Sequence, residues 1–197
     1  MKRIFFLIIV VILCSGCTNK NPIVTMEIKD YGTIKMELYP DYAPNTVANF
    51  VSLINEGFYD SNTFHRLMPG FVLQGGDPTG TGSGGPGYKI AGEFKLNGYR
   101  NNTLSHEESI VSMARAKAYD TAGSQFFIVL DNSAKYSLDN SYAAFGKVIE
   151  GMDIIKKIEK EEVIEDTKSG KLKNNLTIIK TTVDTFGKNY NVKKITN

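Results

Sequence analysis

"FHRLMPGFVLQGGDPTGTGSGGPGY" occupies residues 64–88, and its glycines allow two interpretations. Gly80, Gly82 and Gly85 have the G-x-G-x-x-G spacing of a dinucleotide-binding loop. Such a loop must follow a strand and open a helix, so that the phosphates meet the amides of the helix N-terminus. Here the following "PGYKIAGEF" begins with proline and is extended in character, and Tyr88 rather than a P-loop lysine follows Gly87. The pattern therefore predicts a turning surface loop and argues against a nucleotide site.

The segments around this loop have the patterns of many short strands and two helices. "IVTMEIKDYGTIKMELYP" (23–40) alternates apolar and polar residues about a Tyr31-Gly32 turn, which predicts a β-hairpin. Helical spacing of apolar residues predicts a helix from about Pro44 to Glu56, and "GMDIIKKIEK" (151–160) predicts a shorter helix with Ile154, Ile155 and Ile158 inward. Strands are also predicted in "TFHRL", "FVLQG", "SIVSMAR", "SQFFIVL", "YAAFGKVI" and "LTIIKTTVDTF", with a polar turn at "DTKSGKLKNN". Because there is no βαβ rhythm, these elements favour a closed antiparallel barrel.

The composition is typical of one globular domain, since 42% of the 197 residues are apolar and 22% are charged. Only His65 and His106 are present, without H-E-x-x-H spacing, and cleavage before Cys17 would leave a single cysteine, so we expect no metal site. No serine lies in a G-x-S-x-G elbow, and we expect no cofactor. Removal of an N-terminal signal would leave 21 basic and 21 acidic residues. That balance gives no reason to expect nucleic acid or an acidic membrane surface as a partner.

The first residues have the layout of an export signal, because a basic start and the apolar run 4–13 precede "CSGC", which ends at Cys17. The run is shorter than the roughly 20 residues that a transmembrane helix needs. The segment resembles a bacterial lipoprotein signal, which implies lipidation of Cys17. Cys14 departs from that pattern, and the alternative is a plain secretory signal. We therefore expect a signal peptide at 1–16, a lipidated cysteine and tether at 17–22, a globular domain at 23–187 and a tail at 188–197, held on the extracytoplasmic face of the cell membrane.

Two glutamines lie on the faces of strands where apolar packing is expected. Strand alternation puts Val72 and Gln74 on one face, and it likewise joins Gln125 to Phe127. A glutamine beside an apolar residue suits the wall of a groove that holds a small apolar ring and hydrogen-bonds its backbone. For any one of these residues, ordinary packing or surface placement remains the alternative.

Together these segments resemble the cyclophilin family of peptidyl-prolyl cis-trans isomerases over nearly all of Ile23 to Gly187. The resemblance rests on residues 64–88 and on "SMARA", "GSQFFIVL" and "YAAFGKVIEGMDII", which occur in the family's order and spacing. It implies a mainly β fold, namely a closed eight-stranded antiparallel β-barrel capped by two α-helices, with an active groove on its outer surface. It also implies proline-containing polypeptides as partners, and we expect a monomeric folding catalyst for exported or surface proteins.

The resemblance further implies that Arg66 is the catalytic arginine, acting with Gln74 and Phe71. Rotation about X–Pro faces a barrier of about 18–20 kcal/mol from amide resonance. At the twisted transition state the proline nitrogen recovers its lone pair, so a guanidinium placed against it binds that state better than either planar isomer. By the same resemblance the proline pocket is formed by Phe71, Val72, Phe127 and Leu138; the peptide backbone is held by Gln74 and Arg115; and the groove is completed by His65, Ala114, Ala116, Gln125 and Tyr142.

Four positions depart from the commonest family pattern. Ser137 replaces an aromatic residue, Tyr142 a histidine, Val72 a methionine and Arg115 an asparagine. Because Ser137 removes an aromatic from the rim of the groove, we expect weak binding of the inhibitor cyclosporin. The alternative function is a non-catalytic module or chaperone that holds proline-containing segments. Arg66 favours the enzyme, because a binding module has no need of it.

Overall fold

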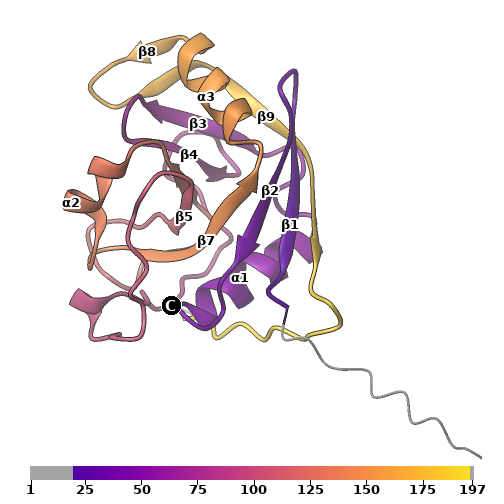
Figure 1. The fold of residues 1–197 in the computed structure, drawn as a ribbon, viewed down its shortest axis with the longest axis vertical. Helices are drawn as coiled ribbons and strands as arrows, with labels where there is room; N and C mark the ends of the chain where they lie inside the picture. Colours follow the sequence, from indigo (N-terminus) through magenta and orange to yellow (C-terminus); the bar gives the residue numbers. More distant parts are fainter. Residues whose placement is uncertain (1–19, 196–197) are drawn as a thin grey trace, which may run out of the picture.

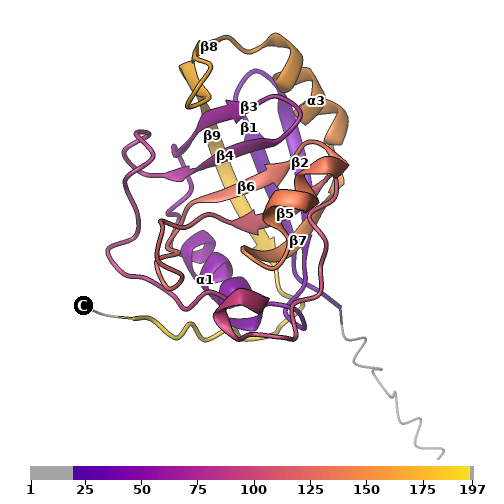
Figure 2. The ribbon, with the colours of Figure 1, turned by 90° about the vertical axis from the view of Figure 1, so that its left-hand side faces the viewer.

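A computed structural model describes residues 20–195, and within them nine strands form one antiparallel sheet (Figures 1 and 2). The sheet order is β1-β2-β7-β5-β6-β4-β3-β9-β8, and β1 also pairs with β9. Eight strands therefore close into a ring, while β8 pairs with β9 outside it, which confirms the expected eight-stranded barrel. The strands are β1 Ile23–Ile28, β2 Gly32–Leu38, β3 Thr63–Met68, β4 Val72–Asp77, β5 Ile110–Met113, β6 Phe126–Val129, β7 Ala143–Glu150, β8 Ile164–Asp166 and β9 Lys171–Asp184.

The two expected helices cap opposite ends of the barrel (Figure 1). They are α1, Pro44–Asn55, and α3, Met152–Glu161. Pro44 begins α1 with a fixed φ and no N–H to satisfy, and the carboxylate of Glu93 accepts from the backbone N–H groups of Asn45 and Thr46. The structure adds a short helix, α2 (Lys135–Leu138), and two 3-10 turns, η1 (Lys95–Asn97) and η2 (Asn132–Ala134).

The barrel interior is an aromatic core. Phe50 of α1 packs in tilted or edge-on contact with Tyr59, Phe126 and Phe145, at 4.9–5.3 Å between ring centroids. Phe126 and Ile128 belong to this core, and Phe127 points to the outer face, as strand alternation predicts. Of the isoleucines expected inward on α3, Ile155 and Ile158 are buried, and Ile154 is half-buried against the core.

Two segments differ from the sequence-based expectation. The last strand begins at Lys171 rather than Leu176, because the first residues of β9 pair with β3 and β8. Side-chain pattern does not indicate this start, since Leu172 is the one buried residue among 171–175. The expected polar turn is therefore confined to the residues between β8 and β9. The C-terminal tail packs against the barrel, where Ile195 and Lys89 exchange backbone hydrogen bonds of 2.7 and 3.2 Å.

The expected signal peptide at 1–16 and Cys17 lie outside the described residues. Within residues 20–195 no helix has the length and apolar character needed to cross a membrane.

Candidate active site

A second apolar cluster lies on the outer face of the barrel, separate from the core. Its buried members come from β4, β5, β6, β7, η2 and α2, and half-buried residues pack around them. The cluster brings together all four residues expected to form the proline pocket, together with Ala114 and Tyr142. It consists of Val72, Ile110, Phe127, Val129, Ala134, Leu138 and Ala144, with Met68, Phe71, Leu104, Ala114 and Tyr142 packed against them.

Arg66 lies at the edge of this cluster. It precedes Met68 by two residues on β3, so both side chains point to the same face. Its Nη1 donates to Oε1 of Gln74 at 3.0 Å, and its Nε donates to the carbonyl of Ser169 at 2.8 Å. Burial lowers the pKa of Arg66 from its ordinary value, yet an arginine remains charged at neutral pH. The guanidinium is therefore a charged donor with a fixed orientation beside an apolar surface.

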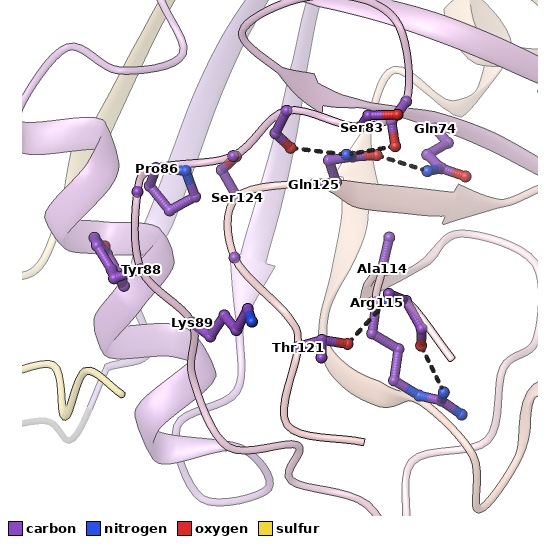
Figure 3. Close-up of a pocket in the computed structure, with 16 residues that line it drawn as sticks. Gln74, Ser83, Pro86, Tyr88, Lys89, Ala114, Arg115, Thr121, Ser124 and Gln125 are labelled. Carbon is purple, nitrogen blue, oxygen red and sulfur yellow. Dashed lines mark hydrogen bonds between the residues drawn. The ribbon is translucent and has the colours of Figure 1, made fainter. Parts of the chain in front are cut away.

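Gln74 and Gln125 form a hydrogen-bonded chain between Arg66 and the glycine loop (Figure 3). Nε2 of Gln74 donates to Oε1 of Gln125 at 3.0 Å, and Nε2 of Gln125 donates to the carbonyls of Gly82 and Gly84 at 3.0 and 2.9 Å. The loop at residues 78–87 thus contacts the arginine site through two amide side chains. This arrangement gives the loop a role that needs no nucleotide.

Beside the apolar cluster lies an open cavity of about 680 Å³ (Figure 3). Five of the expected groove residues line it, and among the described residues that line it Lys89 and Arg115 are charged and none is acidic. Because Gln74, Gln125 and Ala114 also adjoin the arginine and the cluster, the cavity continues the same groove. Its walls include Gln74, Ala114, Arg115, Ala116, Thr121 and Gln125 on one side and residues 82–89 on the other.

Arg115 is held by its own protein. Its guanidinium lies 4.6–5.1 Å from the ring centroids of Phe94, Tyr119 and Tyr142, and it donates to the carbonyl of Ser141 through Nε and Nη2. Nη1 donates to the carbonyls of the two following residues. The side chain therefore fixes the wall of the groove, and its contacts leave little donor capacity for a peptide.

His65 is buried on β3, next to Arg66 in the sequence. It is 5% exposed, and it occupies a register irregularity of β3 between Phe64 and Arg66. Neither of its ring nitrogens has a hydrogen-bond partner among residues 20–195. Burial lowers the pKa of His65, so the ring is neutral at pH 7, beneath the glycine loop near Gly82. His65 is not among the residues that line the cavity, and its place in the groove stays a prediction.

Sequence reasoning missed two parts of the site. The carbonyl of Ser169 holds Arg66 from the turn before β9, and a polar turn carries no signal for such a contact. Behind the ring of Phe127, His106 stacks at 6.1 Å and bridges Asp139 and Ser112 at 2.8 and 2.9 Å. Ser112 is fully buried, so this Ser-His-Asp set supports the pocket wall and cannot present a nucleophile. Within residues 20–195 no group of three or more histidine, cysteine or carboxylate residues could hold a metal.

Comparison with known proteins agrees with this geometry. Residues 23–183 match the family described as cyclophilin type peptidyl-prolyl cis-trans isomerase/CLD. The chain is 47% identical over 141 residues to peptidyl-prolyl cis-trans isomerase B of Bacillus subtilis, covering 72% of this chain and 93% of that protein. It is 41% identical over 161 residues to a peptidyl-prolyl cis-trans isomerase of Helicobacter pylori, covering 74% of this chain and 94% of that protein.

A solved structure is also similar. The crystal structure of a cyclophilin type peptidyl-prolyl cis-trans isomerase of Cryptosporidium parvum, in the presence of the dipeptide Ala-Pro, superposes with a TM-score of 0.70 at 32% identity. It covers 82% of this chain and 98% of that one. The family match spans the whole barrel, from β1 to the end of β9, and the relatives carry the same enzyme name. This chain belongs to the cyclophilin family of peptidyl-prolyl cis-trans isomerases.

Proposed function

We propose that this isomerase is a folding catalyst for exported or surface proteins, and that Arg66 is the residue that lowers the rotational barrier. The observation that carries the proposal is the guanidinium of Arg66, fixed by Gln74 and Ser169 at the edge of the outer apolar cluster. A proline ring in that cluster would bring its nitrogen to the arginine. Phe71, Val72, Phe127 and Leu138 offer the apolar surface such a ring requires.

The chemistry requires no nucleophile or proton transfer. When the X–Pro bond twists, resonance is lost and electron density returns to the proline nitrogen. A charged N–H donor aimed at that nitrogen stabilises the twisted state and has little to bind in the planar isomers. Two acceptors already orient the guanidinium, so little reorganisation is needed as the bond rotates.

The extracytoplasmic location is supported by the order of residues at the N-terminus. A basic start, an apolar run of export length and small residues before Cys17 precede a short polar tether. Residues 18–22 extend at most about 17 Å, at 3.3–3.6 Å per residue. A lipidated Cys17 would therefore hold the barrel close to the membrane surface as a tethered monomer.

The proposal is tested with Arg66→Ala in a protease-coupled assay on a proline peptide. We expect kcat/KM to fall by roughly 100- to 1,000-fold, as for loss of one preorganised transition-state donor. Circular dichroism should show an intact barrel, because Arg66 is not part of the core. A folded variant with near-normal isomerisation would contradict the role of Arg66. If the variant and the wild type both bind a proline peptide without isomerising it, the non-catalytic module is the better description.

A further inference from the structure

The glycine loop is wrapped around a buried carboxylate. Asp77 is 1% exposed, and its Oδ2 accepts from the backbone N–H groups of Thr81, Gly82 and Gly84 at 3.2, 2.6 and 3.0 Å. Its Oδ1 accepts from the backbone N–H and the hydroxyl of Thr79 at 2.8 and 2.9 Å. Burial alone would raise the pKa of Asp77, but these hydrogen bonds lower it to about 2. The carboxylate is therefore ionised at any working pH and dictates the path of the loop.

The contact between loop and carboxylate is too close for any residue but glycine at position 84. A Cβ placed on Gly84 would lie 2.0 Å from Oδ1 of Asp77, whereas a Cβ on the adjacent Gly85 would meet nothing within 4 Å. Gly82 has a φ of +90°, which L side chains rarely adopt. The glycines of the loop therefore serve its closure on Asp77.

The loop in turn sets the direction of the amide chain that reaches Arg66. The carbonyls of Gly82 and Gly84 can only accept, so Gln125 must present Nε2 to them. This leaves Oε1 of Gln125 for Gln74, whose Nε2 must then face Gln125. Oε1 of Gln74 is thereby turned toward the guanidinium of Arg66. If Gln74 were reversed, its Nε2 would face the donors of Arg66; if Gln125 were reversed, its Nε2 would face Nε2 of Gln74.

We infer that Asp77 is a positioning residue for isomerisation: it closes the glycine loop, whose carbonyls orient Gln125 and Gln74 and through them the guanidinium of Arg66. The inference rests on the proposed catalytic role of Arg66 and extends it to a residue that touches no substrate. It predicts that Asp77 controls kcat although its side chain does not line the cavity.

The test is a double-mutant cycle on the full-length protein, with kcat/KM for a proline peptide as readout. Asp77→Asn replaces one acceptor with a donor, and we expect kcat/KM to fall about 10- to 100-fold, the scale of a misplaced catalytic group. Gln125→Ala cuts the chain between loop and arginine. In that background Asp77→Asn should cost less than about threefold, because the route to Arg66 is already broken.

The matched control is Glu93→Gln. Glu93 is likewise a buried carboxylate that accepts from backbone N–H groups, but it serves the start of α1 and has no link to Arg66. We expect Glu93→Gln to lower the thermal midpoint while the folded protein keeps normal kcat/KM. If the loss of kcat/KM in the double variant equals the product of the Asp77→Asn and Gln125→Ala losses, the inference is wrong, and the catalytic role of Arg66 is unaffected. If Arg66 has no catalytic role, the Arg66→Ala variant will instead show normal activity.

A second variant covers the case in which Asp77→Asn does not fold. Gly84→Ala pushes the loop away from Asp77 and keeps the carboxylate. Gly85→Ala is the control, because a Cβ at position 85 meets no atom within 4 Å. In ¹H–¹⁵N spectra we expect the side-chain amide signals of Gln74 and Gln125 and the Arg66 Nε–H signal to shift in Gly84→Ala and to stay in place in Gly85→Ala. Unshifted signals in Gly84→Ala, with normal kcat, would overturn the inference.

Discussion

Ser137 and Leu138 are adjacent in α2 and have opposite surroundings. Leu138 is 5% exposed and belongs to the outer apolar cluster, whereas Ser137 is exposed at its rim. A change at Ser137 can therefore alter what lies over the pocket without disturbing the pocket itself. We therefore expect a change at Ser137 to alter inhibitor affinity more than catalysis.

We expect Ser137→Trp to tighten cyclosporin inhibition by about tenfold, because a rim indole adds apolar contact and an N–H donor worth together about 1.4 kcal/mol. The effect on kcat/KM should be small, since Arg66 and Gln74 are unchanged. Inhibition constants of wild type and variant provide the measurement, and Tyr136→Trp on the same helix is the control. Equal inhibition of Ser137→Trp and wild type would contradict the placement of residue 137 at the rim of the groove.

His106 gives the fold a pH dependence with a defined sign. Burial lowers its pKa, and the hydrogen bond and charge of Asp139 oppose only part of that effect. The unfolded chain therefore binds more protons than the folded one as the pH falls through about 6.5, so the free energy of unfolding decreases toward acid pH. His65, whose pKa burial also lowers, acts in the same direction.

We expect the urea midpoint to fall from pH 7 to pH 5, and His106→Gln to make that slope shallower. The slope is the informative quantity, because the substitution also changes stability at pH 7. A slope in His106→Gln as steep as in wild type would assign the effect to other groups. The pKa values of Asp77 and Asp139 are lowered, so their contribution to the free energy of unfolding is lost at lower pH than that of the histidines.

At the scale of elements, periodicity predicted the strands that have one face in the core. Val24, Met26 and Ile28 alternate and are buried, and α1 begins at Pro44 as predicted. Periodicity could not predict β8 or the start of β9, because their pairing leaves most side chains exposed. Backbone hydrogen bonds to neighbouring strands make those residues β-strand, and side-chain hydropathy does not indicate such bonds.

The candidate site divides in the same way. The resemblance grouped Phe71, Val72, Phe127 and Leu138, and the structure brings them into one cluster. It did not indicate the carbonyl of Ser169 or the contacts that occupy Arg115, since these depend on where turns lie in space. The roles of the predicted site residues in catalysis stay predictions.

The C-terminal tail is a structural element although it lies beyond the family match. Tyr190 and Val192 pack on the core, and Asn45 exchanges hydrogen bonds of 2.7 and 3.1 Å with the backbone of Lys193. Lys194 lies 4.0 Å from the ring centroid of Tyr88, which lines the cavity. The tail therefore supports α1 and the adjoining wall of the groove.

We expect a chain that ends at Gly187 to lose about 2 kcal/mol of stability, from two half-buried apolar side chains. At this chain length that loss lowers the thermal midpoint by about 4–8 °C. A chain ending at Ile195 should melt like wild type. Thermal unfolding of the three proteins is the measurement, and an unchanged midpoint in the shortest would show that the tail contributes nothing.

For the whole molecule, the proposed anchor is a property of the N-terminus rather than of the barrel. One acyl chain binds membranes only marginally, and stable attachment needs at least two. Resemblance to bacterial lipoproteins implies a diacylglyceryl group on the thiol of Cys17, which meets that need. Cys14 stands where the lipoprotein pattern has an aliphatic residue.

We expect Cys17→Ser to abolish labelling by radioactive palmitate and to release the protein from the membrane fraction, and Cys14→Leu to retain both. Cell fractionation of wild type and the two variants is the measurement. An unlabelled wild type found only in the medium would instead describe a plain secreted enzyme.

The pairing of β1 with β9 has a consequence for the order of events in the life of the chain. The ring is sealed by its first and last strands, so its seam stays open until residues near Asp184 are available. Contacts between distant parts of a sequence form slowly, because the intervening chain must first be brought together. When a chain crosses a membrane N-terminus first, β9 is the last strand to emerge, so the ring cannot close on the far side until β9 has crossed. If the chain is exported as proposed, this topology would keep the barrel open until translocation is nearly complete.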